Sequence, residues 1–349
     1  MPASQRFLIV KIGALGDVCF AMPAVRALRE AFPGCRVDWL VGSRDQELIQ
    51  GLPGLERLWV VDTEAVFRRR WRVLLPLSWK WGRAMPRYSA LLLLHRNWGH
   101  LAWLSTFRPP LRSGPTYRLS RAPSRFPGVV SVVVPPLGTH ESLAIREVVS
   151  RVAADLRGNG AFAWKWDFSH IPSPATLLRE VGGPYWVVHT GGGNNTGMSF
   201  GLKQWPHWKA WLEEIADGSA ARWVLVGAPS EQTGFPNHPR VLNWIGRTGV
   251  RELVGLIREA EGLVGVDSGP LHLADALGIP TIGLYGPTSE TSWGLIGPNH
   301  RILSTRHPCS PCYRDDGSVP SCPYHHRCME ELLPRELARA VPGLAGPKT

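Results

Sequence analysis

The chain has 349 residues, which is long for one domain and comfortable for two. Hydrophobic residues make up 44% of it, and no run of about eighteen apolar residues is present that could span a bilayer. The first residues lead directly into a strand pattern and do not resemble a signal peptide, so we expect a cytoplasmic protein.

The net charge of +11 lies in the first half of the chain. Residues 1–175 carry 24 Lys and Arg against 12 Asp and Glu, whereas residues 176–349 carry 15 against 16. This asymmetry predicts an anionic partner for the first half only.

Strands and helices alternate along both halves. We expect strands at 6–12, 35–41, 57–61, 90–94 and 129–134, then at 185–190, 223–227, 262–266 and 281–285, with helices at 18–32, 208–216, 249–260 and 270–277. This alternation predicts an α/β protein with two doubly wound parallel sheets, in domains 1–175 and 176–349. Ligands bind beyond the carboxyl ends of such strands, and two such halves would face each other across a cleft.

The first β-α loop, Lys11 to Val18, carries two glycines three residues apart. It lacks the G-x-G-x-x-G of dinucleotide sites, and Asp17 would repel a phosphate, which argues against NAD or FAD. Asp17 is well placed as a general base above the sheet. It suits a helix N-cap equally well, and spacing alone favours the cap.

A basic segment from Phe67 to Arg83 alternates cations with tryptophans and leucines; its cations include Arg68, Arg69, Arg70, Arg72 and Lys80. Trp favours a membrane–water interface, and Lys and Arg favour anionic headgroups. The alternative is a solvated basic helix whose tryptophans face the core. Pro76 is expected to break any helix here into two short pieces.

The second-half loop from His189 to Pro206 is rich in glycine and hydroxyl groups. Thr190 and Lys203 could hold a diphosphate there, although a flexible surface loop with an incidental lysine has the same composition. It is not a Walker loop, because no Ser or Thr follows Lys203. Glu231, after the next strand, could bind ribose hydroxyls, on a weak signal.

The segment from Val264 to Ala274 reads as a strand, a turn at Asp267 and Ser268, and a helix opening at Pro270. Backbone amides of Ser268, Gly269 and Leu271, together with the helix dipole, form an anion site in this arrangement. An ordinary capped β-α turn looks the same in sequence.

Four cysteines cluster late in the chain: Cys309, Cys312, Cys322 and Cys328. Four thiolates suit a structural zinc, and His307, His325 or His326 could replace one of them. The alternatives are buried structural thiols or an adventitious disulfide. We do not expect these cysteines to be catalytic, because the sequence shows no base paired with any of them.

The motifs taken together resemble a known family. Gly16-Asp17-Val18, Lys203-x-Trp205-Pro206 and Asp267-Ser-Gly-Pro-Leu-His272 occur in the order found in the lipopolysaccharide ADP-heptose heptosyltransferases, glycosyltransferase family 9. The resemblance covers about residues 6 to 340 and implies a GT-B fold.

The resemblance also implies inverting transfer of heptose from ADP-heptose to the inner core of lipopolysaccharide on lipid A and Kdo, without a metal or other cofactor. By the same resemblance Asp17 is the general base, Lys203 binds the diphosphate, Glu231 binds the ribose, and Asp267 to His272 form the donor loop. The basic segment would face the acceptor and the inner surface of the cytoplasmic membrane.

Two other functions remain open. One is a related GT-B enzyme or epimerase that uses a UDP-sugar. The other is a non-catalytic nucleic-acid-binding protein, against which the absence of any RNP, zinc-finger or helix-turn-helix signature argues.

Overall fold

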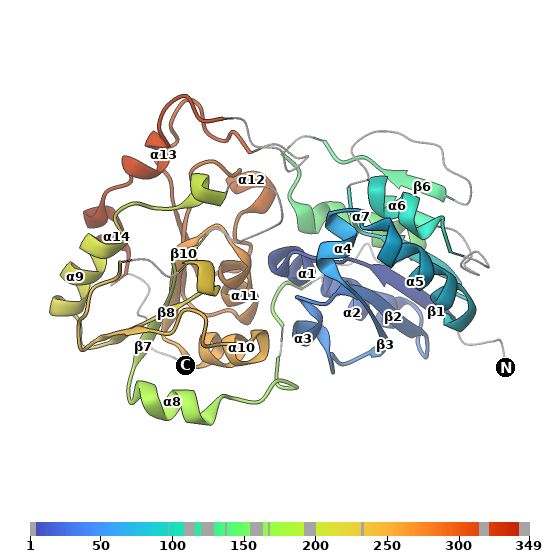
Figure 1. Cartoon of the computed structure of the whole chain (residues 1–349), viewed down its shortest axis with the longest axis horizontal. Coiled ribbons are helices and arrows are strands. Elements are labelled where there is room, and N and C mark those ends of the chain that lie inside the picture. Colours follow the sequence, from blue (N-terminus) through green and yellow to red (C-terminus); the bar gives the residue numbers. More distant parts are fainter. Residues whose placement is uncertain are drawn as a thin grey trace. The chain divides into compact units, whose positions relative to one another are not determined.

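The computed structural model describes residues 5–96, 98–107, 116–119, 129–136, 138–153, 163–166, 168–191, 200–231, 234–313 and 321–341. The chain divides into two compact units, residues 1–163 and 164–349 (Figure 1). From the sequence we expected the boundary after residue 175, but residues 164–175 belong to the second unit. The Trp164 Nε1 donates a hydrogen bond to Asp275 Oδ2 at 2.7 Å, and the Trp166 amide donates to the Ala276 carbonyl at 2.9 Å.

The first unit is built on a parallel sheet with the order β3-β2-β1-β4-β5-β6. Its strands are β1 (Arg6–Val10), β2 (Arg36–Gly42), β3 (Leu55–Val61), β4 (Ala90–Leu93), β5 (Thr116–Leu119) and β6 (Val129–Val133). Its helices are α1 (Leu15–Ala21), α2 (Pro23–Ala31), α3 (Gln46–Ile49), α4 (Thr63–Phe67), α5 (Trp71–Ala84), α6 (Trp98–Leu104) and α7 (Glu141–Val152). Strands β1 and β4 are buried along their whole length, as expected for a parallel sheet covered on both faces.

The second unit is built on a parallel sheet with the order β12-β11-β10-β7-β8-β9. Its strands are β7 (Tyr185–His189), β8 (Arg222–Val226), β9 (Val241–Asn243), β10 (Gly262–Val266), β11 (Thr281–Leu284) and β12 (His300–Leu303). Its α-helices are α8 (Ala175–Val181), α9 (Trp208–Gly218), α10 (Val250–Glu259), α11 (Gly269–Leu277), α12 (Glu290–Trp293), α13 (Arg327–Glu330) and α14 (Pro334–Ala340). Two 3₁₀ turns, η1 (Phe200–Lys203) and η2 (Pro229–Glu231), follow β7 and β8.

Both sheets have the same topology. Counted within each unit, the strands follow the doubly wound order 3-2-1-4-5-6, which confirms the predicted architecture of each half. The strand order reverses between β1 and β4 in the first sheet and between β7 and β10 in the second. Ligands of doubly wound sheets bind beyond the carboxyl ends of the strands at this switch point. The loops after these four strands are therefore where functional groups are expected.

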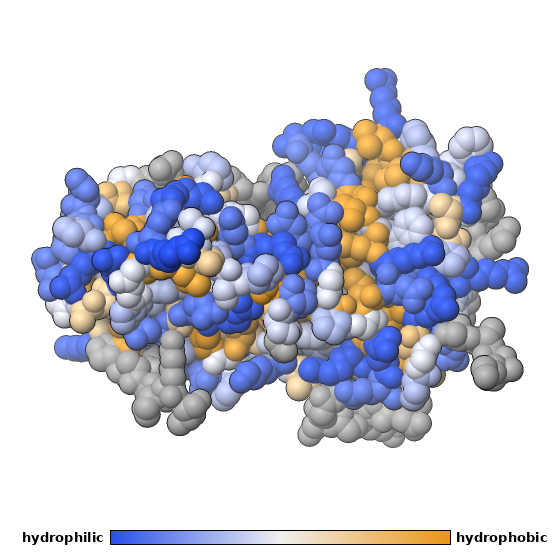
Figure 2. Space-filling model, turned by 90° about the horizontal axis from the view of Figure 1, so that it is seen from below, coloured by the Kyte–Doolittle hydropathy of each residue, from blue (hydrophilic) through white to orange (hydrophobic). Residues whose placement is uncertain are grey.

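Each unit has its own hydrophobic core. In the second unit Trp205, Trp208, Trp211 and Trp223 pack edge to face, with ring centroids 4.9–5.8 Å apart between successive rings. Such aromatic contacts add to the stabilisation from burial. On the face shown in Figure 2, hydrophilic residues cover most of the surface and hydrophobic residues show in strips between them.

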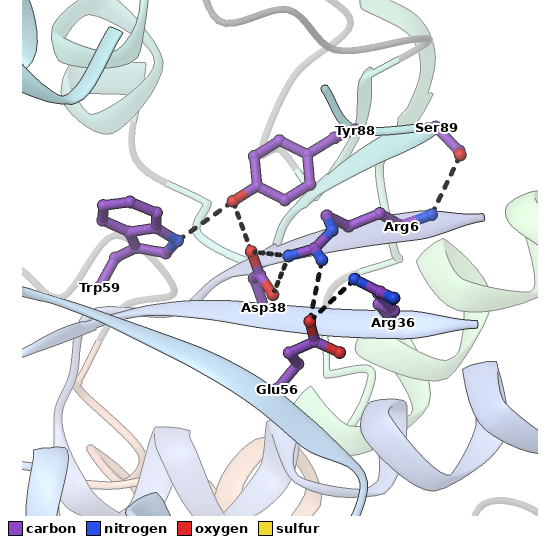
Figure 3. Close-up of polar contacts among 7 residues, drawn as sticks. All are labelled: Arg6, Arg36, Asp38, Glu56, Trp59, Tyr88 and Ser89. Atoms are coloured by element: carbon purple, nitrogen blue, oxygen red, sulfur yellow. Dashed lines mark hydrogen bonds and ion pairs between the residues drawn. The ribbon is translucent and has the colours of Figure 1, made fainter. Parts of the chain in front are cut away.

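A buried polar network occupies the amino ends of β1, β2 and β3 (Figure 3). The Arg6 guanidinium donates to both carboxylate oxygens of Asp38 at 3.1 Å and to Glu56 Oε1 at 2.9 Å. The Tyr88 hydroxyl donates to Asp38 Oδ2 at 2.8 Å, and Trp59 Nε1 donates to that hydroxyl at 3.1 Å. Burial and the nearby Asp38 charge raise the pKa of Tyr88. Ligands of such sheets bind at the carboxyl ends of the strands, whereas this network lies at their amino ends. We therefore interpret it as a structural network that holds the three strands together.

Two predictions about helices need correction. Helix α5 runs through Pro76 instead of breaking there. Proline has no backbone N–H, so the carbonyl four residues before it loses its helical hydrogen bond. Pro76 is exposed, and water can donate a hydrogen bond to that carbonyl instead. The helix expected over 18–32 is divided at Met22, because Pro23 begins a second helix. In the part of the chain that the structure describes, no helix has both the length and the apolarity to cross a membrane.

Candidate active site

Asp17 lies in the first turn of α1, directly beyond the carboxyl end of β1. Its Oδ2 accepts a hydrogen bond from the Ala14 amide at 3.2 Å, and its Oδ1 lies 3.3 Å from Lys11 Nζ. The N-cap residue is Ala14, and Asp17 is the third residue of the helix, so the prediction that Asp17 is the N-cap is wrong. Its carboxylate nevertheless accepts a hydrogen bond from the backbone amide of the N-cap residue. The side chain remains 35% exposed, which leaves the carboxylate reachable.

A buried ionic cluster lies behind Asp17. Lys11 Nζ donates to the Leu94 carbonyl at 2.9 Å and to Glu141 Oε1 at 3.1 Å, and Arg96 Nε donates to Glu141 Oε2 at 3.0 Å. Burial lowers the pKa of Lys11, but the carboxylates of Asp17 and Glu141 outweigh burial and hold that pKa above its usual value. Burial raises the pKa of Glu141, but Lys11 and Arg96 outweigh it and lower that pKa. Lys11 therefore stays charged although it is buried.

Two further groups line the same edge. His95, directly after β4, accepts a hydrogen bond at Nε2 from the Ile12 amide at 2.7 Å, so its proton resides on Nδ1. Burial, with the nearby His100 and Lys11, holds the pKa of His95 well below its usual value. Asp45, beyond β2, is buried, and burial and the Asp17 charge raise its pKa to about 7.

The basic segment forms α4 and α5 of the first unit. Arg68, Arg69, Arg70, Arg72 and Lys80 are all exposed. Of its tryptophans, Trp81 is buried, whereas Trp71 and Trp79 are exposed. The segment is thus a solvated basic helix on one side and an apolar surface on another, and neither interpretation from the sequence describes it completely.

In the second unit Lys203 contacts the turn that follows β10. Its Nζ lies 2.8 Å from Asp267 Oδ2, and His272 Nε2 lies 3.0 Å from Asp267 Oδ1. Burial raises the pKa of Asp267, but Lys203 and His272 outweigh burial and hold that pKa far below its usual range. The Asp267 carboxylate therefore fixes Lys203 and His272 beside the start of α11.

Helix α11 begins at Gly269, one residue before the predicted start, and ends at Leu277 as predicted. Ser268 is its N-cap residue in extended conformation, and the Ser268 hydroxyl lies 3.0 Å from His189 Nδ1. The first amides of any α-helix lack helical acceptors. The amides around Ser268, Gly269 and Leu271 therefore have the geometry of an anion site at the second switch point.

Glu231 and Thr190 lie beside a pocket of about 350 Å³ within the second unit. Its lining also includes Trp205 and Phe235. Glu231 Oε2 accepts from the Ala228 amide at 2.9 Å and lies 3.6 Å from His189 Nε2. Its lining contains two carboxylates, those of Glu231 and Glu330. The volume and the mixture of aromatic rings with these carboxylates are typical of a pocket for a small ligand such as a nucleoside.

The close fit of Glu231 depends on glycine. A Cβ atom on Gly191 or Gly227 would collide with the Glu231 carboxylate, so these two positions must lack a side chain for Glu231 to lie there. Residues 192–199 of the glycine-rich loop lie outside the described residues.

The four late cysteines are free thiols, so no disulfide joins them. Cys309 Sγ lies 3.0 Å from His307 Nδ1, and burial together with the neighbouring thiols raises the pKa of Cys328 to about 11. Among the described residues no group of three or more His, Cys, Asp or Glu side chains is arranged to hold a metal ion. The expected zinc ligands Cys309, Cys312, Cys322 and Cys328 therefore do not form such a set, and Cys328 instead packs in the hydrophobic core.

Sequence reasoning missed Lys11, Asp45, His95, Arg96 and Glu141 as parts of the first edge. Three of them, Lys11, His95 and Arg96, directly follow β1 and β4, the two strands at the switch point. A charged or titratable residue just after such a strand was the signal that could have found them. Glu141 and Asp45 come from elsewhere in the fold and gave no such signal.

Comparison with known proteins gives a consistent result. Residues 195–321 match the model of glycosyltransferase family 9 (heptosyltransferase). Lipopolysaccharide heptosyltransferase 1 of Pseudomonas aeruginosa is 27% identical, over 89% of this chain and 86% of the relative. The structure of E. coli ADP-heptose lps heptosyltransferase II matches with a TM-score of 0.74 and 16% identity, covering 98% of both chains. E. coli heptosyltransferase WaaC with ADP matches with a TM-score of 0.64 and 23% identity, covering 85% of this chain and 92% of that one.

These matches confirm the GT-B fold class and the resemblance that the sequence motifs indicated. The matched range includes Lys203, Glu231 and the segment from Asp267 to His272. Residues 195–321 therefore match a family 9 glycosyltransferase domain, and the chain is a glycosyltransferase similar to the lipopolysaccharide heptosyltransferases.

Proposed function

We propose that the protein transfers heptose from ADP-heptose to the inner core of lipopolysaccharide, with inversion at the anomeric carbon. Similarity to lipopolysaccharide heptosyltransferase 1 over 89% of the chain supports the reaction class. The observation that carries the proposal is that each unit has functional groups at its switch point and that the chemistry of these groups differs between the two units. One presents a reachable carboxylate, and the other presents an ammonium beside a helix start.

The second unit would bind the donor, and the first unit, residues 1–163, would bind the acceptor. The 350 Å³ pocket with Glu231 suits a nucleoside, because the carboxylate can accept hydrogen bonds from two ribose hydroxyls. Thr190 lines the same pocket. Lys203 and the first amides of α11 would hold the diphosphate, and Asp267 and His272 would position Lys203 through the short contacts around the Asp267 carboxylate.

The chemistry follows from these roles. A hydroxyl of the acceptor attacks the anomeric carbon of heptose, and Asp17 takes the hydroxyl proton as that bond forms. The bond between the anomeric carbon and the diphosphate oxygen breaks, and ADP departs with the electron pair. Lys203 and the helix-start amides offset the charge that develops on the diphosphate, which is usually a large part of catalysis. Attack opposite the leaving group inverts the anomeric configuration.

Lys11 and Glu141 support the base assignment. Lys11 is held in place by Glu141 and by the Leu94 carbonyl, and it lies 3.3 Å from the oxygen of Asp17 that is not used by the Ala14 amide. It can keep the Asp17 carboxylate oriented before the reaction. We propose no catalytic metal, since each role in the transfer is filled by a side chain or a backbone amide. The site of action is proposed to be the inner face of the cytoplasmic membrane, where a lipid-linked acceptor is made.

The direct test supplies ADP-heptose and a Kdo-lipid A acceptor to the purified protein and measures the product by mass spectrometry. We expect the mass gain of one heptose and, by NMR of the product, an anomeric configuration opposite to that of the donor. A product of retained configuration would contradict the mechanism. Thermal stabilisation by UDP but not by ADP, with no transfer from ADP-heptose, would replace the proposal by a UDP-sugar enzyme.

A further inference from the structure

The α4–α5 surface, which we define as the side chains of Phe67, Trp71, Leu75 and Trp79, is apolar and faces solvent. These residues are 41%, 38%, 47% and 57% exposed, and Val73, which is 49% exposed, lies on another face of α5. The described residues include nine exposed large hydrophobic side chains, so more than half of them lie between positions 67 and 79. Apolar residues gathered in this way indicate a contact surface, whereas scattered ones do not.

Helix α5 is packed against the rest of the first unit, so this surface is not exposed for lack of packing. Helix α5 already buries one face, through Leu74, Ser78 and Trp81, which are spaced as neighbours on a helix. Trp71, Leu75 and Trp79 are spaced four residues apart and form a second stripe beside the buried face. Helix α5 therefore presents an apolar stripe that folding of the unit does not require.

Positive charge surrounds the stripe. Between residues 64 and 83 the chain has one acidic residue, Glu64, and six basic residues: Arg68, Arg69, Arg70, Arg72, Lys80 and Arg83. Glu64 pairs with Arg68 at 3.1 Å and with Arg70 at 2.8 Å. The Arg83 guanidinium lies over the Trp79 ring, 3.9 Å from its centroid, as in a cation–π contact. The segment keeps a strong positive excess next to its exposed rings.

We propose that the α4–α5 surface docks the protein on a lipid bilayer that carries anionic headgroups. The centre of a protein-binding surface is depleted of charged residues. A membrane–water interface favours Trp with Arg and Lys, because the ring enters the headgroup layer while the cation binds lipid phosphates. At 14 residues α5 is about 21 Å long, which suits a helix lying in the plane of the interface. The inference goes beyond the proposed transfer and does not depend on it.

The test measures binding of the full-length protein to lipid vesicles by flotation, without donor or acceptor. We expect binding to phosphatidylcholine vesicles with about 30% phosphatidylglycerol and little binding to phosphatidylcholine alone, with weakening as salt rises from about 0.1 M to about 0.5 M. The triple variant Trp71→Ala/Leu75→Ala/Trp79→Ala should lose about tenfold or more in vesicle partitioning. Leu143→Ala, an equally exposed apolar side chain on α7, is the matched control and should bind like the wild type.

Folding of each variant is checked by its thermal midpoint and by ADP binding, and the single variant Trp79→Ser serves if the triple variant does not fold. Wild-type protein that binds neither kind of vesicle would overturn the proposal. It would also be overturned if the triple variant bound vesicles like the wild type. A variant that keeps vesicle binding but loses self-association in sedimentation velocity would show instead that this face joins two copies of the chain. Because no sugar is transferred in this experiment, its outcome is separate from that of the transfer assay.

Discussion

The two switch-point edges share one topology but have opposite polarity. In the first unit a cation, Lys11, is buried and a carboxylate, Asp17, is the more exposed partner. In the second unit a carboxylate, Asp267, is buried and an ammonium, Lys203, lies against it beside a helix start. The same doubly wound frame thus presents an accessible carboxylate after the strands of one sheet and an ammonium beside a helix start after those of the other. Function follows from the side chains at the strand ends, because the order of strands is the same in both sheets.

The largest effect is expected from Asp17→Asn. An amide cannot take the proton of the acceptor hydroxyl, and loss of a general base usually costs about 10²- to 10⁴-fold in rate. The measurement is kcat for heptose transfer. Glu147→Gln, an exposed carboxylate on α7 of the same unit, is the matched control and should keep the wild-type kcat. Near wild-type turnover by Asp17→Asn would remove the base assignment.

Glu141→Gln probes the buried side of the first edge. The change leaves Lys11 and Arg96 without their shared carboxylate, and breaking a buried ion pair costs about 3 kcal/mol of unfolding free energy. We also expect kcat to fall while the Kd for ADP stays unchanged, because Glu141 would act only through Lys11. Denaturant unfolding and ADP titration measure the two effects. A weakened ADP affinity without loss of stability would contradict the proposal that Glu141 acts only in the first unit and ADP binds only to the second.

Glu231→Gln probes the pocket of the second edge. A charge-assisted hydrogen bond to a sugar hydroxyl contributes about 2 kcal/mol, so ADP binding should weaken about tenfold or more. Inhibition by inorganic pyrophosphate should stay as in the wild type, since pyrophosphate has no ribose. Glu213→Gln, an exposed acid on α9, is the control. Equal losses for ADP and pyrophosphate would contradict a ribose contact.

Asp45→Asn probes stability and carries a defined pH dependence. The pKa of Asp45 is raised from 3.8 to about 7, so the folded state keeps this proton where the unfolded chain has released it. Stability of the wild type therefore falls as pH rises between these two values. The variant lacks this loss, and its advantage should grow from little near pH 4 to about 4 kcal/mol above pH 7. Thermal midpoints across this range test it, and a constant difference would contradict the shift.

Much of the fold followed from local patterns. The buried strands are nearly continuous apolar runs, so nine of them could be placed from the sequence within one or two residues of the observed bounds. Short strands such as β5 (Thr116–Leu119) and β9 (Val241–Asn243) lack such runs and gave no signal. Helix α5 was misjudged at Pro76, because whether water can reach the freed carbonyl depends on tertiary structure.

The sequence predicted the arrangement of the site residues only where they lie together in one loop. The turn at Asp267 and Ser268 before α11 is local, and its sequence indicates it directly. The contact of Lys203 with Asp267 joins residues 64 positions apart, and that of Lys11 with Glu141 joins residues 130 positions apart. Spacing cannot reveal such pairs, which form only when the sheets assemble.

The central claim is that the first edge supplies the base and the second holds the leaving diphosphate. It is tested most directly by titrating ADP calorimetrically into Asp17→Asn and Lys203→Ala, with Lys165→Ala as an exposed lysine control. We predict a wild-type Kd for Asp17→Asn and for the control, and a Kd weakened about tenfold or more for Lys203→Ala, whose ammonium would hold the diphosphate. An unchanged Kd for Lys203→Ala, or a weakened Kd for Asp17→Asn, would contradict this division of roles.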